Sequence, residues 1–515
     1  MVSDFVNEPF LNLTDEQVVT HFKKALEQVG SQLGGNYPLI INGEEIYTEE
    51  KITSLNPSLS DQVVGYVAKA SLEQAELALS SAEKAFGTWS KVKPQERAEY
   101  LFKAAAIMRE RKYELSSWLI YEAGKNWAEA DADTAEAIDF LEFYAREMHR
   151  LASPQPLVKI PGEQNELVYL PLGVGVVIPP WNFPLAIMAG MTAAAIVAGN
   201  TVVLKPASNT PVIAAIFMNI LKEVGLPEGV VNYLPGSGGT IGDFLVSSPK
   251  TRFINFTGSK EVGLRINELA AKMVAGQRHI KRVTAEMGGK DCIVVDNTAD
   301  IEAAATAIVA SSFGFQGQKC SACSRAIIVK DVYDQVVQLV VQKAAQLTIG
   351  TAVENYPVGP VTDKSSLNRI KSYIETGKNE GDLLLGGNTL ESMGGYYIEP
   401  TIFGNVSPNA VIAQEEIFGP VLAVIKADDF NQALEIANNT EYGLTGALFS
   451  QDRSHLERAR SEFHVGNLYF NRKCTGALVG VHPFGGFNMS GTDSKAGGRD
   501  YLLLFTQAKV VSEKL

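Results

Sequence analysis

The chain of 515 residues is long enough for two or three domains, and its content of 46% hydrophobic and 20% charged residues is ordinary for a globular enzyme. Its net charge of -13 disfavours nucleic acid as a partner, because polyanion binding is driven by clustered Lys and Arg. Four cysteines are too few for a disulfide framework, and the acidic N-terminus lacks a secretory signal, so we expect a cytoplasmic protein.

Helical periodicity dominates the first third of the chain. In residues 71–86 the apolar positions keep to one face, and Ser71 with Gln74 forms a capping box. Residues 93–124 and 133–152 continue the pattern. From residue 173 short apolar strands alternate with helices, as in "GVGVVIPP", "TVVLKPAS", "GVVNYLPG" and "TRFINFTGS". This alternation predicts βαβ units and a parallel sheet.

Residues 183–204 imitate a membrane span, because they contain no charged side chain over a length that could cross a bilayer. Pro184 opens this segment, however, and Gly199 and Asn200 interrupt it before the β-branched run "TVVL". We therefore expect a buried helix, a turn and a buried parallel strand, and no membrane partner.

A second alternating series begins with "DCIVVD" and passes through "SRAIIVKDV" to "PVLAVIKADD". It predicts a second α/β domain that starts near Glu286. The closing segment "YLLLFTQAKVVSEKL" has the pattern of a strand, and we expect it to pair outside its own domain.

Two polar motifs follow predicted strands. In "IPPWNFP", Trp181 and Asn182 occupy the place where α/β sheets bind ligands, although an Asn there is also a common turn residue. Lys205 follows "VVL" and suits a phosphate or a sugar hydroxyl, or it is simply a solvated lysine. The glycine-rich segments 235–242 and 256–263 each lie between strand and helix and favour an anion, but neither matches G-x-G-x-x-G.

Cys320 and Cys323 form a C-x-x-C pair in "GQKCSACSR". A structural zinc site lacks further ligands at suitable spacing, so we expect no metal. A thioredoxin-like pair would open a helix, whereas this one leads into a predicted strand. A single nucleophilic cysteine remains, and Glu286, next to a Gly-Gly turn, is a candidate base.

The chain resembles the aldehyde dehydrogenase superfamily through "PWNFP", "LKPA", "FTGS", "EMGGK", "GQKCSA", "EEIFGP" and "HPFGG", in the family's order. The forms "GQKCSACSR" and "TGALVGVHPFGG" are similar to the branch that oxidises L-glutamate γ-semialdehyde, formed from 1-pyrroline-5-carboxylate, to L-glutamate in proline degradation. The alternatives are another semialdehyde, or a CoA-acylating relative. Glu286, a ready base for hydrolysis, argues against the CoA-acylating class.

The resemblance implies that Cys320 is the nucleophile, that Glu286 activates water, and that Asn182 holds the oxyanion with the Cys320 backbone N–H. It implies NAD as cofactor, with binding residues Ile178, Trp181, Lys205, Ser208, Gly238, Gly258, Ser259, Glu416 and Phe418. NAD-preferring members often have Glu three residues after the lysine, whereas this chain has Ser208, so we expect NADP to be accepted as well.

The resemblance also nominates substrate contacts. Ser321, Gly476 and Ala477 are expected to hold the α-carboxylate, since backbone N–H groups of small residues can converge on an anion. Phe183 and Phe484 are expected to be aromatic walls around the aliphatic chain. The alternative for Gly476 and Ala477 is that they only turn the chain.

The expected fold class is α/β, with two Rossmann-like parallel-sheet domains, one for the cofactor and one for catalysis, plus a small β oligomerisation flap. The expected dinucleotide-binding domain covers residues 1–148 and 172–284, and the catalytic domain covers 285–483. The flap covers 149–171 and 484–515. By resemblance, the flap pairs with a neighbouring chain's C-terminal strand, so at least a homodimer is expected.

Overall fold

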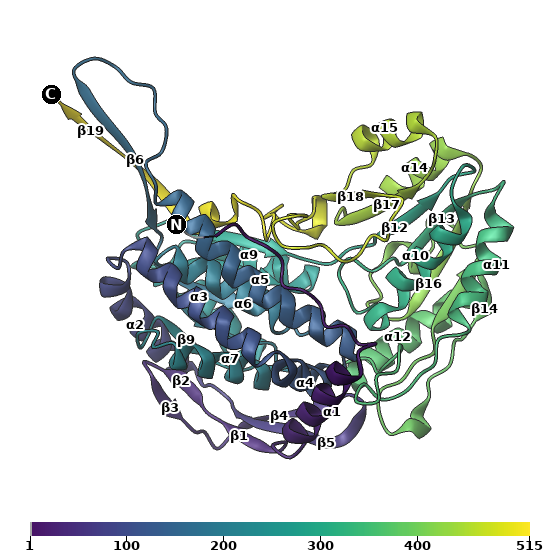
Figure 1. Ribbon diagram of the computed structural model, residues 1–515, viewed down its shortest axis with the longest axis horizontal. Helices are drawn as coiled ribbons and strands as arrows, with labels where there is room; N and C mark the ends of the chain where they lie inside the picture. The colour runs from purple at the N-terminus through teal and green to yellow at the C-terminus, as the bar shows by residue number, and fades with distance from the viewer. Residues whose placement is uncertain (1–2) are drawn as a thin grey trace.

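The computed structural model describes residues 3–515, which form two α/β units and a projecting ribbon (Figure 1). A seven-stranded sheet lies in each unit. The expected α/β class with parallel-strand sheets is confirmed.

The first sheet has the strand order β11-β10-β7-β8-β9-β2-β3. Its parallel strands are β7 (Val174–Ile178), β8 (Thr201–Leu204), β9 (Val231–Tyr233), β10 (Thr251–Thr257) and β11 (Arg282–Glu286). β2 (Leu39–Ile41) and β3 (Glu44–Ile46) close one edge in antiparallel pairing. A separate small sheet of β1 (Gly35–Tyr37), β5 (Leu59–Ala68) and β4 (Lys51–Asn56) was not expected from the sequence.

Helices cover both faces of the first sheet because alternate side chains of its strands are apolar. Val174 and Val176 pack with α2 and α8 on one face, whereas Val177 belongs to the larger core on the other face. The helices of this unit are α1 (Glu16–Gly30), α2 (Leu72–Trp89), α3 (Pro94–Glu110), α4 (Lys112–Ala123), α5 (Trp127–Leu151), α6 (Ala186–Val197), α7 (Pro211–Glu223), α8 (Asp243–Ser247) and α9 (Lys260–Ala271). The expected capping box of Ser71 and Gln74 begins α2.

The membrane-like segment folds as the sequence predicted. It contains α6, which lies almost wholly in the protein core, a turn at Gly199, and the buried strand β8. Within residues 3–515 no helix is long and apolar enough to cross a membrane.

The second sheet has the order β14-β15-β16-β13-β12-β17-β18. Its strands are β12 (Cys292–Val295), β13 (Arg325–Val329), β15 (Thr401–Gly404), β16 (Val421–Ala427), β17 (Thr445–Phe449) and β18 (Asn467–Phe470), all parallel, with β14 (Asp382–Leu385) antiparallel at the edge. Its helices are α10 (Ile301–Phe313), α11 (Tyr333–Ala344), α12 (Lys364–Gly377), α13 (Val411–Gln414), α14 (Phe430–Asn438) and α15 (Arg453–Glu462).

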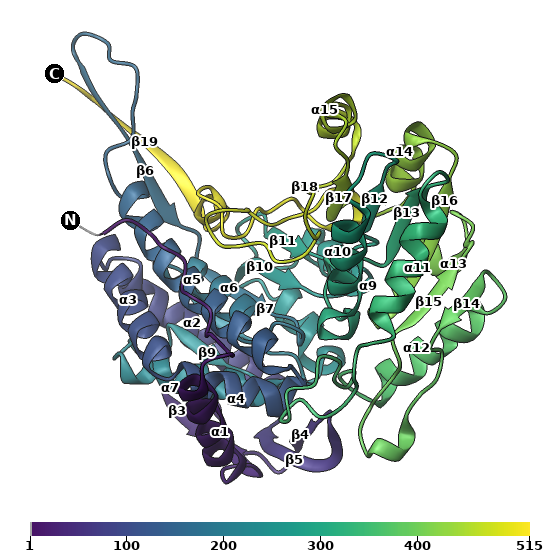
Figure 2. The ribbon, with the colours of Figure 1, turned by 45° about the vertical axis from the view of Figure 1, so that its right-hand side comes forward.

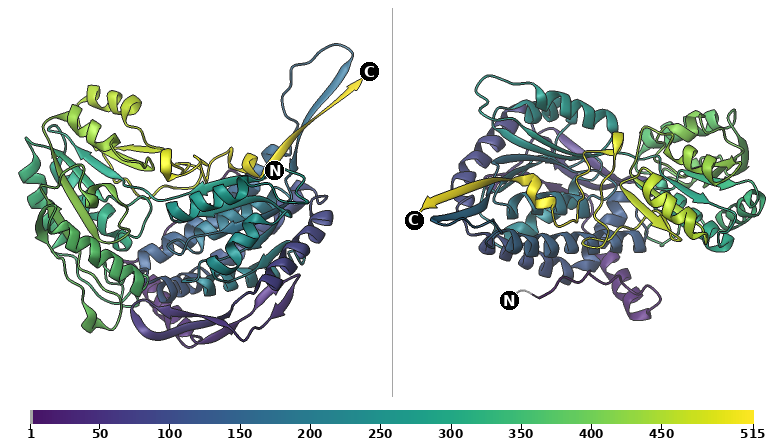
Figure 3. Two further views of the ribbon diagram at one scale, coloured as in Figure 1. Left: turned by 180° about the vertical axis from the view of Figure 1, so that it is seen from behind. Right: turned by 90° about the horizontal axis from the view of Figure 1, so that it is seen from above.

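After β18 the chain returns from the second unit to the first (Figure 3). Tyr501, Leu502 and Phe505 pack into the core of the first unit. The ribbon itself consists of β6 (Glu163–Pro171) and β19 (Thr506–Lys514), so it is shorter than the flap expected from residue 484 onward.

The ribbon projects from the body of the molecule (Figures 1 and 2). β6 and β19 pair antiparallel within one chain, from Thr506 opposite Pro171 to Lys514 opposite Glu163. The returning chain thus delivers β19 to one edge of β6 in the same molecule, and pairing of the flap with a neighbour's C-terminal strand stays a prediction.

Candidate active site

The candidate nucleophile Cys320 lies half-buried in the loop between α10 and β13. After α10 the chain turns sharply, and Phe315 and Gln316 have φ values of 48° and 55°, in the left-handed region that non-glycine residues adopt only at a cost. Gly317 follows with φ 67°, where a Cβ would lie 2.3 Å from the Gly419 carbonyl oxygen. The surrounding contacts must hold this strained turn in place. The turn sets the direction in which the chain enters the loop that carries Cys320.

Asn182 is tied directly to that loop. It follows β7, is buried, and donates from its side-chain amide to the carbonyl oxygen of Gln318 at 3.0 Å. An asparagine amide has two N–H donors, so one is still available for a second acceptor. The structure therefore brings Asn182 beside the segment that carries Cys320.

Glu286 ends β11 and is buried against the C-terminal segment. Its backbone bridges to Gly491, and the Ser494 hydroxyl lies 3.5 Å from one carboxylate oxygen. Its other oxygen, Oε1, has no hydrogen-bond partner among residues 3–515. Burial raises the pKa of Glu286 well above its usual range, while the Lys495 ammonium and the Ser494 hydroxyl act in the opposite direction.

The Gly288-Gly289 turn after β11 allows close packing around the thiol. A Cβ at Gly288 would lie 2.2 Å from the Glu416 carboxylate, and one at Gly289 would lie 2.6 Å from the Cys320 carbonyl oxygen. Glycine is therefore required at Gly289, where a backbone oxygen is in the way, whereas a side chain at Gly288 would displace the Glu416 carboxylate.

Burial and nearby carboxyl groups oppose the ionisation of the Cys320 thiol. Burial raises its pKa well above the usual range, and Glu286, Asp291 and Glu416 raise it further by repelling a thiolate. The thiol is therefore protonated until a base or a cation assists its ionisation.

The predicted cofactor residues gather at the ends of the first sheet's strands. Ile178 ends β7, Lys205 follows β8, and Gly238 begins the short π-helical turn Gly238–Gly242 after β9. Gly258 follows β10, and Ser259 caps the start of α9. Exposed N–H groups of helix starts at strand ends suit a pyrophosphate.

Lys205 is a buried cation that needs an acceptor. It is 6% exposed, and within residues 3–515 its ammonium donates only to the backbone oxygen of Pro206, at 3.4 Å. Burial lowers its pKa to about 8. A ribose hydroxyl would satisfy this group, so the site fits a dinucleotide. Ser208, which is exposed, lies nearby in the same loop.

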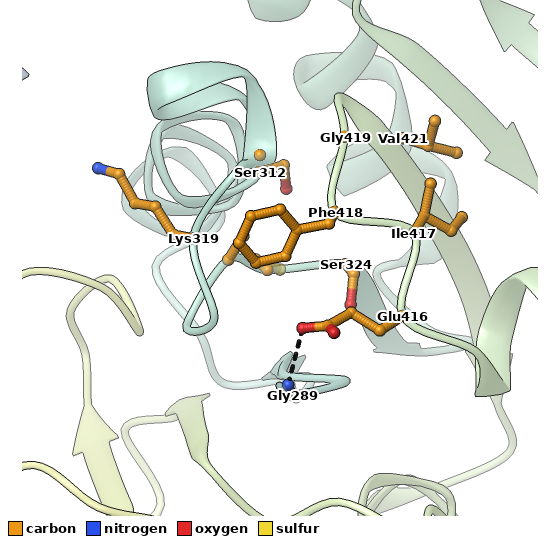
Figure 4. Close-up of a pocket in the computed structure, with 12 residues that line it drawn as sticks. Gly289, Ser312, Lys319, Ser324, Glu416, Ile417, Phe418, Gly419 and Val421 are labelled. Carbon is orange, nitrogen blue, oxygen red and sulfur yellow. Dashed lines mark hydrogen bonds between the residues drawn. The ribbon is translucent and has the colours of Figure 1, made fainter. Parts of the chain in front are cut away.

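Glu416 and Phe418 line a pocket beside the cysteine loop, together with Lys319 and Ser324 (Figure 4). Glu416 accepts a hydrogen bond from the Gly289 N–H at 3.0 Å, and burial raises its pKa to about 7. Phe418 has φ 56°, and its ring meets that of Trp181 edge to face with centroids 5.4 Å apart. The structure thus brings these three predicted cofactor residues together.

The predicted substrate residues lie on four segments. Cys474 donates from its thiol to the Ser321 carbonyl oxygen at 3.4 Å, which joins the 474–477 turn to the cysteine loop. Arg472 braces this turn by donating to the carbonyl oxygen of Gly476 at 3.1 Å, and Ala477 follows. The two other residues are Phe183, whose ring lies 6.4 Å from that of Phe315, and Phe484, which pairs with Ala496.

The second cysteine of the C-x-x-C pair is buried, and its thiol donates to the Arg325 carbonyl oxygen at 3.3 Å. All four cysteines are free. Residues 3–515 contain no group of three or more His, Cys, Asp or Glu side chains that could hold a metal ion.

The sequence did not predict that charged residues between α4 and the cysteine loop would lie beside the site. Lys319 pairs with Glu129 of α5 at 2.6 Å, and Lys125, fully buried, pairs with Asp133 at 3.0 Å. Lys125 follows Gly124, which ends α4. Its position in the sequence relative to the other motifs does not indicate that it belongs to a site.

The site lies at the ends of parallel strands and contains a buried cation and a cysteine whose pKa is raised by carboxyl groups. These features indicate the class of protein: a nucleotide-binding α/β enzyme whose reaction uses a thiol. The Aldehyde dehydrogenase family model matches residues 46–511, and the chain belongs to this family. It is 61% identical over 514 residues to 1-pyrroline-5-carboxylate dehydrogenase of Geobacillus thermodenitrificans, with 100% of each chain covered. It is 59% identical to 1-pyrroline-5-carboxylate dehydrogenase 2 of Bacillus subtilis, again over both full lengths.

A solved structure of 1-pyrroline-5-carboxylate dehydrogenase from Thermus with bound NAD matches with a TM-score of 0.98 and 53% identity over 100% of both chains. The resemblance to aldehyde dehydrogenases is therefore confirmed along the whole fold.

Proposed function

We propose that the protein oxidises L-glutamate γ-semialdehyde, the open form of 1-pyrroline-5-carboxylate, to L-glutamate with NAD, as a step of proline degradation. The observation that carries the proposal is the full-length identity of about three residues in five with enzymes named for this substrate. The proximity of Asn182 to the cysteine loop and of Glu286 to Cys320 supports it.

The chain's own residues supply the chemistry. The thiolate of Cys320 adds to the aldehyde carbon, and the resulting oxyanion is held by the Asn182 amide and the Cys320 backbone N–H. NAD, when bound, supplies the acceptor for the hydride that leaves this carbon. A thioester on Cys320 remains, and Glu286 takes a proton from the water that attacks it. The carbon–sulfur bond then breaks, which releases the acid and restores the thiol.

Ionisation of Cys320 is the step that the surroundings oppose. Burial and three carboxyl groups raise the pKa of the thiol, and burial also raises the pKa of Glu286. Local hydrogen-bond donors must therefore assist the ionisation of the thiol. Glu286 acts in the later step, because a carboxylate whose proton affinity is raised is a better acceptor for the proton of the attacking water.

The cofactor residues have separate tasks. Lys205 binds the adenosine ribose, Trp181 and Ser259 bind the pyrophosphate, and Glu416 binds the nicotinamide ribose with Phe418 beside the ring. Ile178, Ser208, Gly238 and Gly258 complete the site. Ser208 carries no charge to repel a 2'-phosphate, so NADP is accepted as well as NAD.

The substrate is held at both ends. Ser321 and the N–H groups of Gly476 and Ala477 bind the α-carboxylate, and the carbonyl-directed bonds of Arg472 and Cys474 fix the turn that presents them. Phe183 and Phe484 enclose the aliphatic chain. Propanal lacks the carboxylate and gains nothing from this anchor.

The test is the formation of reduced cofactor from glutamate semialdehyde and from propanal, each with and without CoA. We expect a higher kcat/KM for glutamate semialdehyde and no need for CoA. Cys320→Ala should abolish turnover, because a methyl group cannot add to the aldehyde, whereas the matched control Cys323→Ala stays active. A preference for propanal, or a requirement for CoA, would contradict the proposal.

The protein works as a homodimer or a larger homo-oligomer. Its projecting two-stranded ribbon exposes Val510, Val511 and Leu170, and an isolated two-stranded ribbon is only marginally stable in water. A second copy of the chain would cover it. The four free cysteines are consistent with the reducing cytoplasm as its location, which fractionation of the cell would test.

A further inference from the structure

The ammonium of Lys125 occupies an unusual place beneath the candidate active site. The side chain is fully buried, and its nitrogen lies 3.7 Å from the ring centroid of Phe183 and 4.7 Å from that of Phe315. Asp133 of α5 provides its counter-charge at 3.0 Å. Burying a charge is costly unless it is paired, so this arrangement requires the contacts that surround it.

The two rings belong to different walls of the site. Phe183 is next to Asn182, on the turn after β7, whereas Phe315 lies in the strained turn that leads to Cys320. A cation and the face of an aromatic ring attract each other, and this attraction is strongest where water is excluded. One ammonium therefore contacts both the segment with the oxyanion donor and the segment with the nucleophile.

Asp133 anchors this cation to the scaffold. Its Oδ2 faces Lys125, and its Oδ1 accepts a hydrogen bond from the N–H of Ala186, the first residue of α6, at 2.7 Å. The ammonium is thus fixed relative to α5 and α6, which both belong to the rigid core of the first unit.

We infer that Lys125 is a positioning residue that sets the separation between Asn182 and Cys320 by holding the rings of Phe183 and Phe315. The inference rests on the proposed roles of Asn182 and Cys320. The left-handed backbone at Phe315 persists only where neighbouring contacts determine it, and the ring–ammonium contact is one of these. Loss of the charge lets the cysteine loop relax away from the oxyanion donor.

The principal variant is Lys125→Met with Asp133→Asn, measured in the full-length protein. Methionine retains the length of the side chain without its charge, and asparagine avoids an unpaired buried carboxylate while its oxygen still accepts from Ala186. We expect the rate of hydride transfer in the first turnover to fall by about tenfold to a hundredfold, because misplacement by an ångström has effects of this size. Binding of NAD, measured by calorimetry, should change less than about twofold.

A second buried lysine–aspartate pair, whose aspartate also lies on α5, is the matched control. Lys112 pairs with Asp131 at 3.1 Å, and this aspartate also accepts a backbone N–H, from Leu11 at 2.7 Å. Lys112→Met with Asp131→Asn therefore removes an equivalent pair remote from the rings. Its first-turnover rate should stay within about twofold of wild type; an equal loss in both double variants would overturn the inference.

Phe315→Leu tests the route of the effect and leaves the ion pair intact. It should slow hydride transfer on its own, and adding it to the Lys125 double variant should cause no further loss, because both changes break the same contact. Losses that multiply would overturn the inference. An unchanged rate in Phe315→Leu would also overturn it, and this rate can be measured even if the double variant fails to fold. The rates are measured with glutamate semialdehyde and propanal, so an error in the proposed substrate shows in the wild type alone.

Discussion

At the scale of single residues, the carboxyl group of Glu286 decides how the rate depends on pH. The working form is the carboxylate, and burial raises its pKa, so the base is fully ionised only above the usual range of a glutamate. Thioester hydrolysis should therefore increase as pH rises through this raised pKa and then level off. Ser494→Ala removes a hydroxyl that favours the carboxylate, so it should move the midpoint to higher pH.

Single-turnover and steady-state rates over a pH series measure this shift. Glu286→Gln is the reference, because it should release one burst of reduced cofactor and then stall, with steady-state turnover lowered about a hundredfold to ten-thousandfold. An unchanged midpoint in Ser494→Ala would show that this hydroxyl has no part in the ionisation.

Ser208 is the residue that we expect to govern the choice between NAD and NADP. Ser208→Glu should lower kcat/KM for NADP by about tenfold relative to NAD, since a carboxylate repels the 2'-phosphate. Ser208→Gln has the same size without the charge and should leave the ratio close to that of wild type. A wild-type enzyme that already rejects NADP would assign the selectivity to another residue.

Some site residues could be found in the sequence because their signals are local. Lys205 and Asn182 each follow an apolar strand, and Cys320 lies in a loop of small residues. Lys125 could not be found in this way. The rings of Phe183 and Phe315 that it contacts belong to other segments, and only the packing of the folded chain brings them to the ammonium.

At the scale of elements, Glu122 fixes the start of α7. This buried carboxyl group of α4 accepts from the N–H groups of Val212 and Ile213, at 2.7 and 2.8 Å, and from the Ser54 hydroxyl at 2.8 Å. Burial nevertheless raises its pKa from 4.5 to about 7. The Glu122 carboxyl group thus joins α7 to α4 and to β4. Its ionised form is destabilised because the group is buried.

The raised pKa makes the stability of the fold depend on pH. Between about 4.5 and about 7 the folded chain binds a proton at Glu122 that the unfolded chain has lost, so this contribution to the free energy of unfolding decreases as pH rises. Glu122→Gln should remove this decrease, which amounts to about 3 kcal/mol. Urea unfolding at several pH values measures it. Glu223→Gln, at the exposed end of α7, is the control. It should not alter the dependence of the free energy of unfolding on pH.

The elements themselves were largely predictable. β-branched runs between glycine and proline predicted the strands of both sheets, and Gly199 with Asn200 separated α6 from β8. The sheet of β1, β5 and β4 was not predictable, since its strands are short or pair at irregular register. The intramolecular pairing of β6 with β19 depends on the path of the returning chain, which no local pattern specifies.

At the scale of the whole molecule, the ribbon is the part of the structure least supported by its own chain. Val510 lies directly opposite Leu167 and is 61% exposed, on strands that contact only each other over most of their length. Burying such valines against a second copy would stabilise both the ribbon and the oligomer, since each removes apolar surface from water. Each of the two units in the body has its own large apolar core, and Val510 and Val511 belong to neither.

We therefore expect Val510→Lys to dissociate the oligomer without unfolding the chain, because a buried, unpaired charge at the interface costs more than the lost apolar contact. Light scattering should show a mass close to that of one chain, 55.7 kDa, where wild type shows at least twice this value. Met273→Lys places the same charge at a site of equal exposure, 63%, away from the ribbon, and should leave the mass unchanged. If the Val510 variant kept the wild-type mass, the subunits would have to meet through another surface, and the exposed face of β19 would require a different partner.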